Sequence, residues 1–281
     1  MSEIFFNNAN SRQTYFTLHN IKAAHALASG KDVKVGVIDW LFAYSENQTL
    51  YSGCADIANK PETLNQSGHG YWMANTLREI APKCEIYAIN AVEYGDNADR
   101  IGLLEQAVEW AIQNGIDVLT YSHPAFTGND KHRADTLIEK AAQAGIVTTF
   151  IHCDSQQNIW PYGCFPFKQS SNFNRTPDVN ILHFDYSILR IDVYERYKSI
   201  IAAEQRVQSG DDVPFFSVSS MSPVLGGFIA LMKEIKRGLT ADECRKILRE
   251  TSYSVTAQSA NWYDVNPCDN VVDIGKAVAA I

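Results

Sequence analysis

Short apolar runs alternate with amphipathic segments along residues 33–151 of the chain. The run 33–39 (VKVGVID) is rich in β-branched residues and ends in a carboxylate, which is typical of a buried parallel strand. Similar strand-like runs follow at 85–91, 116–121 and 146–151. Between them, apolar residues recur at helical spacing in the segments 71–80, 101–114 and 134–144. This alternation predicts an α/β fold with a three-layer, doubly wound, mostly parallel sheet.

The second half of the chain is less regular. Residues 155–216 are rich in Asn, Gln, Pro and aromatic residues and show little periodicity. An apolar helix is predicted over 219–236, and a capping box at 240–243 begins another helix. A short strand or turn and a helix follow over 270–281. Because there is no linker-like change in composition and no internal repeat, we expect a single domain over residues 1–281.

Composition narrows the class of protein. Of the 281 residues, 46% are hydrophobic and 20% are charged, which is ordinary for a globular chain and excludes wholesale disorder. The net charge is −8, with 24 basic against 32 acidic residues, which argues against a nucleic-acid partner. The N-terminus lacks the basic and apolar regions of a signal peptide, and no apolar run reaches about 18 residues. We therefore expect no membrane span and a cytoplasmic location.

The sequence gives no sign of a metal centre. Its six cysteines are scattered without a C-x-x-C pair, so the spacing of metal ligands is absent. Free buried thiols are the favoured interpretation in a chain without an export signal, and disulfides are the alternative. Four acids are interpreted as solvated rather than as calcium ligands, since they lack the required spacing: Asp96, Asp99, Asp211 and Asp212.

Three polar residues occupy positions that favour chemistry. Asp39 ends the first predicted strand, and ligands bind beyond the carboxyl ends of strands in open parallel sheets. His69 begins the next helix and is flanked by two glycines, which let backbone or substrate approach closely. Ser219 begins the apolar helix, where the helix N-terminus favours developing negative charge. An acid, a histidine and a serine make up a nucleophilic triad, and this chain order is the subtilisin order.

Several segments in the right order resemble the subtilisin-like serine proteases (subtilases, peptidase family S8). The aspartate, histidine and serine segments are 35–39, 67–74 and 219–227, where the serine segment reads SSMSPVLGG. The remaining matches are Ala81-Pro82, 109–118, 240–250 and 270–279, so that the resemblance covers about residues 17 to 281. The chain is thus identified as a divergent member, for which a subtilisin-like fold and serine endopeptidase activity are expected. We also expect no prosegment, because only residues 1–32 precede the first predicted strand.

The resemblance also implies roles for the triad. Ser219 would attack the peptide carbonyl, His69 would move the proton, and Asp39 would hold the tautomer of His69. Pro223 and Gly227 fix the register of the serine segment, which assigns the nucleophile to Ser219 rather than to its neighbour Ser220. No organic cofactor or metal is needed for this chemistry, although several subtilases carry structural calcium.

The oxyanion position departs from the family pattern. The strand that ends in asparagine in the family ends here in Asp154, and an ionised carboxylate accepts hydrogen bonds but does not donate them. Loss of one such donor costs about 10²- to 10³-fold in rate. Two alternatives remain open: a protonated Asp154 donates the hydrogen bond, or a local shift brings in Gln156, Gln157 or Asn158.

The substrate-binding segment is altered as well. The resemblance places six residues along the substrate, namely Tyr121, Ser122, His123, Pro124, His152 and Cys153. Pro124 removes one backbone donor from the edge that pairs with extended substrate, and Ala125 narrows the specificity pocket. Further departures are Trp40-Leu41 after the aspartate and Ser217 before the nucleophile. We expect a narrow specificity.

Three hypotheses follow. The first is a serine endopeptidase that acts on a peptide or protein substrate. The second is a catalytically impaired subtilase-fold protein that binds a peptide or a partner protein, and it is motivated by Asp154, Ser217 and Pro124. The third is a protease that is active only with a regulatory protein partner.

Overall fold

The computed structural model describes residues 2–6, 16–17, 19–95, 98–123, 126–151, 153–163, 178–181, 218–259 and 266–281. A parallel sheet with the strand order β3-β4-β2-β5-β6 lies at its centre. These strands are β2 (Lys34–Asp39), β3 (Gly53–Asp56), β4 (Glu85–Asn90), β5 (Val118–Tyr121) and β6 (Val147–Thr148). The four predicted strands are confirmed, and β3 is an edge strand that the sequence pattern did not predict.

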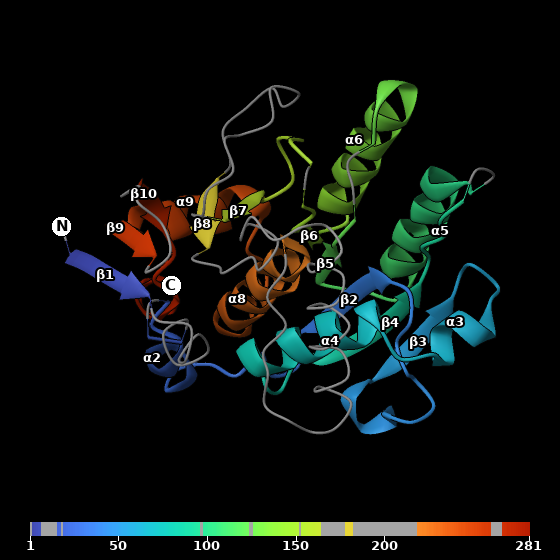
Figure 1. The fold of residues 1–281 in the computed structure, drawn as a ribbon, viewed down its shortest axis with the longest axis horizontal. Helices are drawn as coiled ribbons and strands as arrows, with labels where there is room; N and C mark the ends of the chain where they lie inside the picture. Colours follow the sequence, from blue (N-terminus) through green and yellow to red (C-terminus); the bar gives the residue numbers. More distant parts are fainter. Residues whose placement is uncertain are drawn as a thin grey trace.

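Helices cover both faces of this sheet and complete the predicted three layers (Figure 1). One face carries α5 (Arg100–Gln113) and α6 (Gly128–Gln143), which pack against each other. The other carries α4 (His69–Ile80) and α8 (Met221–Ile235). The central strand β2 serves both cores, because Val35 and Val37 face α4 and α8 whereas Ile38 faces α5 and α6.

Shorter elements surround these layers. The helices are α2 (Ile21–His25), α3 (Pro61–Asn65), α9 (Ala241–Glu250) and α10 (Ile274–Ala279), with 3-10 turns η2 (Gln48–Leu50) and η4 (Val218–Ser220). The capping box predicted at Thr240 is present, because its hydroxyl accepts from the backbone N–H of Glu243 and the Glu243 carboxylate accepts from that of Thr240. Helix α6 begins at Gly128, six residues before the predicted start. The prediction began too late because the first turns of the helix are polar and show no apolar periodicity.

A second sheet has the order β1-β9-β10-β8-β7 and was not predicted. Its strands are β1 (Ser2–Phe6), β7 (Pro161–Gly163), β8 (Val179–Ile181), β9 (Tyr253–Ser259) and β10 (Asn266–Val271). Only the β9–β10 pair is antiparallel among these pairings. Strand β7 packs against α8, and Val179 and Ile181 of β8 join the same core.

Helix α8 approaches its neighbours closely through two adjacent glycines. A Cβ atom at Gly226 would lie 2.5 Å from Cγ2 of Thr120 on β5, and one at Gly227 would lie 2.6 Å from Cβ of Ile80 on α4. Larger side chains at these positions would push the helix away from the sheet and from α4. The two glycines therefore fix the position of α8, whose N-terminus follows Ser219.

A Gly226→Val substitution should test this close packing. The added side chain overfills the contact with Thr120, so the free energy of unfolding should fall by about 2 kcal/mol in urea titrations followed by circular dichroism. The matched control is Gly238→Val, since a Cβ there meets no heavy atom within 4 Å, and it should change stability by less than about 0.5 kcal/mol. Equal effects of the two substitutions would contradict close packing at Gly226.

Candidate active site

Asp39 is a fully buried carboxylate at the carboxyl end of the central strand β2. Its Oδ1 accepts a hydrogen bond from the backbone N–H of Trp40 at 2.8 Å. A buried charge of this kind is costly unless hydrogen bonds and opposite charges compensate it. Two histidines supply much of that compensation.

The first histidine is His69, at the first residue of α4. Its Nδ1 lies 2.9 Å from both carboxylate oxygens of Asp39. The flanking glycines allow this approach, because a Cβ at Gly70 would lie 2.5 Å from the carbonyl oxygen of Trp40 and one at Gly68 would lie 2.7 Å from Leu41. The backbone N–H of Gly70 donates to the same Trp40 carbonyl at 2.8 Å. The predicted pairing of Asp39 with His69 is therefore present in the structure.

The second histidine is His123, which the sequence had placed along the substrate. It is 3% exposed, and its Nε2 lies 3.2 Å from Oδ1 of Asp39, although the alignment departs from that of an ideal hydrogen bond. Its Nδ1 lies 2.6 Å from the hydroxyl of Tyr94. A signal for this contact was present in the sequence, because His123 lies two residues beyond β5, the strand next to β2.

The two histidines set the ionisation of the carboxylate. Burial alone would raise the pKa of Asp39, but the facing rings of His69 and His123 hold that pKa well below its usual range. Burial lowers the pKa of His123, and the nearby Asp39 carboxylate only partly opposes this shift. The arrangement is thus an ionised aspartate that is held by one partly exposed and one buried imidazole.

Ser219 lies in the 3-10 turn η4, directly before α8, and its side chain is partly exposed. Its carbonyl accepts a hydrogen bond from the hydroxyl of Ser122 at 2.8 Å, which ties the turn to the end of β5. Helix α4, which begins at His69, packs against both η4 and α8. The neighbouring Ser220 is buried. The structure therefore brings the segments of Asp39, His69 and Ser219 to the same edge of the sheet.

Two of the expected substrate residues, at the end of β5, form hydrogen bonds within the protein. Tyr121 is buried, and its backbone N–H donates to the hydroxyl of Ser222 at 3.0 Å. Ser122 is also buried and holds Ser219 as described above. Pro124, Ala125, His152 and Ser217 lie outside the described residues, as do Asp96, Asp211 and Asp212.

Asp154, at the expected oxyanion position, forms an ion pair. Its side chain is 2% exposed, and its Oδ1 lies 2.8 Å from Nζ of Lys131 on α6. Lys131 also lies 3.0 Å from Asp135. Burial would lower the pKa of Lys131, but the carboxylates of Asp154 and Asp135 raise it. The contact favours an ionised Asp154 over a protonated donor.

The three alternative oxyanion donors lie elsewhere or are already engaged. The side-chain amide of Asn158 donates to the carbonyls of Phe150 and Cys153, and its oxygen accepts from the N–H of Phe150. Gln156 is exposed, and Gln157 lines a pocket of about 610 Å³ together with Asp117 and the start of α9.

The cysteines in the described part of the chain include four free thiols: Cys54, Cys84, Cys153 and Cys244. Burial raises the pKa of Cys84, Cys153 and Cys244 to about 12. Buried thiols with a raised pKa are poor nucleophiles, and the expected place of Cys153 along the substrate stays a prediction.

Asp39, His69 and His123 also form the one cluster with metal-ligand character among the described residues, with one ligand atom each within 4.8 Å of the others. The ring nitrogens concerned already face the Asp39 carboxylate. Neutral imidazoles that donate to a carboxylate account for the geometry, so we assign no metal to the cluster.

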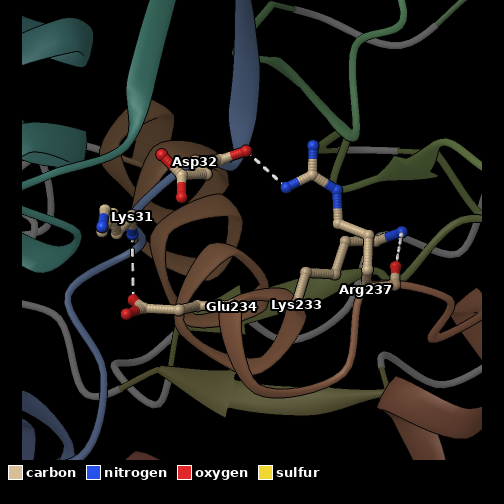
Figure 2. Close-up of a pocket in the computed structure, with 5 residues that line it drawn as sticks. All are labelled: Lys31, Asp32, Lys233, Glu234 and Arg237. Atoms are coloured by element: carbon tan, nitrogen blue, oxygen red, sulfur yellow. Dashed lines mark hydrogen bonds between the residues drawn. The ribbon is translucent and has the colours of Figure 1, made fainter.

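A separate pocket of about 320 Å³ lies at the opposite end of β2, lined by Lys31, Asp32, Lys233, Glu234 and Arg237 (Figure 2). Its charged groups bind the protein's own backbone: Glu234 accepts from the N–H of Lys31 at 2.9 Å, and Arg237 donates to the carbonyl of Asp32. These contacts hold the end of α8 to the turn before β2.

In the described part of the chain, no helix is both long and apolar enough to cross a membrane.

Acid should destabilise the protein through Asp39. Folding lowers the pKa of Asp39 from its usual value of 3.8, so the unfolded chain binds more protons in acid and stability falls as the pH drops below about 4. An Asp39→Asn substitution removes this contribution, so the free energy of unfolding from urea titrations should depend less steeply on pH below 4. The control Asp130→Asn changes an exposed acid and should follow the wild type. Parallel pH profiles of wild type and Asp39→Asn would refute the lowered pKa.

The chain shares limited sequence similarity with known proteases. It is 25% identical over 128 residues to the minor extracellular protease Epr of Bacillus subtilis (strain 168), and the matched region covers 42% of this chain and 19% of that protein. It is 27% identical over 128 residues to subtilisin DY of Bacillus licheniformis, covering 42% of this chain and 46% of that protein. The match thus spans less than half of either relative. No protein-family model matches the chain.

Structural similarity extends over nearly the whole chain. A lanthipeptide protease superposes with a TM-score of 0.64 at 14% identity, covering 94% of this chain and 95% of that chain. A protease from Pseudoalteromonas arctica superposes with a TM-score of 0.62 at 15% identity, covering 93% of this chain and 94% of that chain. The prenylagaramide maturation protease PagA superposes with a TM-score of 0.60 at 14% identity, covering 93% of this chain and 97% of that chain. The chain therefore has the subtilisin-like fold and, by its sequence similarity to subtilisins, is a divergent relative of the subtilases.

Proposed function

We propose that the chain is a serine endopeptidase that cleaves a peptide or protein substrate through Asp39, His69 and Ser219. The observation that carries the proposal is the contact of His69 Nδ1, at 2.9 Å, with both oxygens of a buried carboxylate at the end of the central strand. This contact directs Nε2 of the same ring away from Asp39, which is the orientation that a catalytic base requires. His69 is partly exposed, as a group that meets substrate must be.

The proposed reaction follows from these positions. Ser219 Oγ attacks the scissile carbonyl while Nε2 of His69 takes its proton, and the ionised Asp39 stabilises the imidazolium that forms. The imidazolium then protonates the leaving amine, which departs and leaves an acyl group on Ser219. Water attacks this acyl group and gives its proton to His69, and the bond to Ser219 Oγ then breaks as His69 returns the proton to that oxygen, which releases the second product and restores the enzyme. The backbone N–H of Ser219 supports the oxyanion at the start of α8.

A peptide is the substrate class that the comparisons support best. Two of the similar structures are named for peptide processing, one as a lanthipeptide protease and one as a prenylagaramide maturation protease. A narrow specificity, a cytoplasmic location and the absence of a required cofactor remain predictions from the sequence.

A second candidate function is the binding of a peptide or partner protein without cleavage. It is favoured by the ion pair between Asp154 and Lys131, because this pair supports an ionised carboxylate at the residue that the resemblance assigns to the oxyanion. A regulatory partner that displaces Lys131 or Asp154 would reconcile the two functions. Reactivity of Ser219 in the isolated protein distinguishes them.

A fluorophosphonate probe should label the wild type at Ser219, because the probe reacts only with an activated serine. Ser219→Ala should abolish labelling, whereas the control Ser220→Ala removes the neighbouring buried hydroxyl and should leave the labelled residue unchanged. Mass spectrometry of the modified peptide identifies the residue. A folded wild type that stays unlabelled would instead support the binding function.

Asp154→Asn should raise the labelling rate near neutral pH, because an amide donates where the carboxylate repels the developing oxyanion. Lys131→Met should lower the rate, since it leaves the buried charge of Asp154 without its ammonium partner. The second-order rate constant of labelling measures both effects. A fall in rate with Asp154→Asn would show that the carboxylate itself supports the site.

A further inference from the structure

His123 is tied to the candidate triad on one side and to Tyr94 on the other. Its Nε2 lies 3.2 Å from Oδ1 of Asp39, and its Nδ1 lies 2.6 Å from the hydroxyl of Tyr94. The ring is 3% exposed and lies 5.2 Å, centroid to centroid, from the ring of His69. Two imidazoles thus meet the same buried carboxylate.

Asp39 and Tyr94 together set which nitrogen of a neutral His123 carries the proton. The ionised carboxylate of Asp39 only accepts, so the proton is on Nε2, which faces it. Burial raises the pKa of Tyr94 to about 12, so its hydroxyl stays protonated and can donate to the lone pair left on Nδ1. The opposite tautomer would point a lone pair at the carboxylate and would be repelled.

Trp40 supports this arrangement from the strand end. Its backbone N–H donates to Asp39 at 2.8 Å, while its indole ring packs edge-on against the ring of Tyr94 with centroids 5.2 Å apart. Trp40 and His123 are both positions at which the sequence departs from the subtilase pattern. In the structure they are two parts of one assembly around Asp39.

Titratable groups from several neighbouring elements face His123. Asp39 on β2 and His69 on α4 lie on one side, Tyr94 follows β4, and Tyr121 lies on β5 with its ring centroid 5.2 Å away. Arg100 on α5 donates to the hydroxyl of Tyr121 at 3.3 Å, and its positive charge adds to the lowering of the pKa of His123 that burial causes. His123 therefore acts as a neutral donor.

We propose that His123, oriented by Tyr94, is a positioning residue that holds the Asp39 carboxylate ionised and turned toward His69. This role rests on the proposed endopeptidase function. His123 touches no reacting atom in this account and acts through Asp39 alone. In this proposal His123 contacts Asp39 instead of the substrate.

The proposal predicts a specific change when the donor is removed. In His123→Leu, the Asp39 carboxylate loses one donor and its negative charge is less stabilised. The pKa values of both Asp39 and His69 should therefore rise. The maximal rate of fluorophosphonate labelling should fall by about 10- to 100-fold, because Asp39 is no longer held toward His69 and a small misplacement of a catalytic group can cost about 10²-fold in rate. The acid limb of the pH profile of labelling should also move to higher pH.

Three further variants separate positioning from folding. His123→Gln keeps an N–H near the place of Nε2 and should restore most of the rate and the position of the acid limb. Tyr94→Phe keeps the ring packing on Trp40 but removes the hydroxyl, so its effect should be smaller and in the same direction. His132→Leu removes an exposed histidine on α6 and should match the wild type. A rate loss in His123→Leu without a shift of the acid limb, or without rescue by glutamine, would overturn the proposal.

Nitrogen-15 NMR of the histidine rings tests the same geometry without activity. His123 should be neutral with its proton on Nε2 at neutral pH in the wild type, and Tyr94→Phe should shift the Nδ1 resonance because that nitrogen loses the contact with the hydroxyl. A proton on Nδ1, or a charged His123 at neutral pH, would overturn the proposal. If the wild type does not react with the probe, the proposed function fails, while the His123 tautomer and the rise of the His69 pKa in His123→Leu still decide the positioning role.

Discussion

The structure depends on one buried negative charge, the carboxylate of Asp39 at the end of the central strand. A carboxylate removed from water is stable only where donors and opposite charges replace its hydration. Here the backbone N–H of Trp40, the imidazole of His69 and the imidazole of His123 replace it. The helix that begins at His69, the turn after β2 and the segment after β5 must all converge on this point.

The rest of the fold secures that convergence. Helix α8 is held at its start by the contacts of Ser122 with Ser219 and of Tyr121 with Ser222, and at its end by Glu234 and Arg237. Close glycine contacts press its middle against β5 and α4. The turn that contains Ser219 is therefore fixed to the end of β5, the strand next to the one that carries Asp39, by the Ser122 and Ser222 hydroxyls.

The sequence predicts those parts of the molecule that rest on regular patterns. The alternating strands and helices, the glycines beside His69 and the capping box at Thr240 follow from local chemistry, and the structure contains each of them. The second sheet was not predicted, because β7 and β8 are only three residues long and the pairings of β1 with β9 and of β8 with β10 join distant parts of the sequence. The roles of His123 and Lys131 were missed for the same reason, since each acts through a residue that lies close in space but is distant in sequence. The resemblance supplied the triad, whereas only the structure shows what surrounds its aspartate.

The central claim is that Ser219, His69 and Asp39 form one catalytic unit that His123 supports from beneath. A crystal structure of the protein with a peptidyl boronic acid, which mimics the tetrahedral intermediate, tests this most directly. The account predicts that boron bonds to Ser219 Oγ, that Nε2 of His69 lies within about 3 Å of that oxygen, and that His123 remains against Asp39. Boron bound to another residue, or a Ser219 hydroxyl turned away from His69, would contradict it.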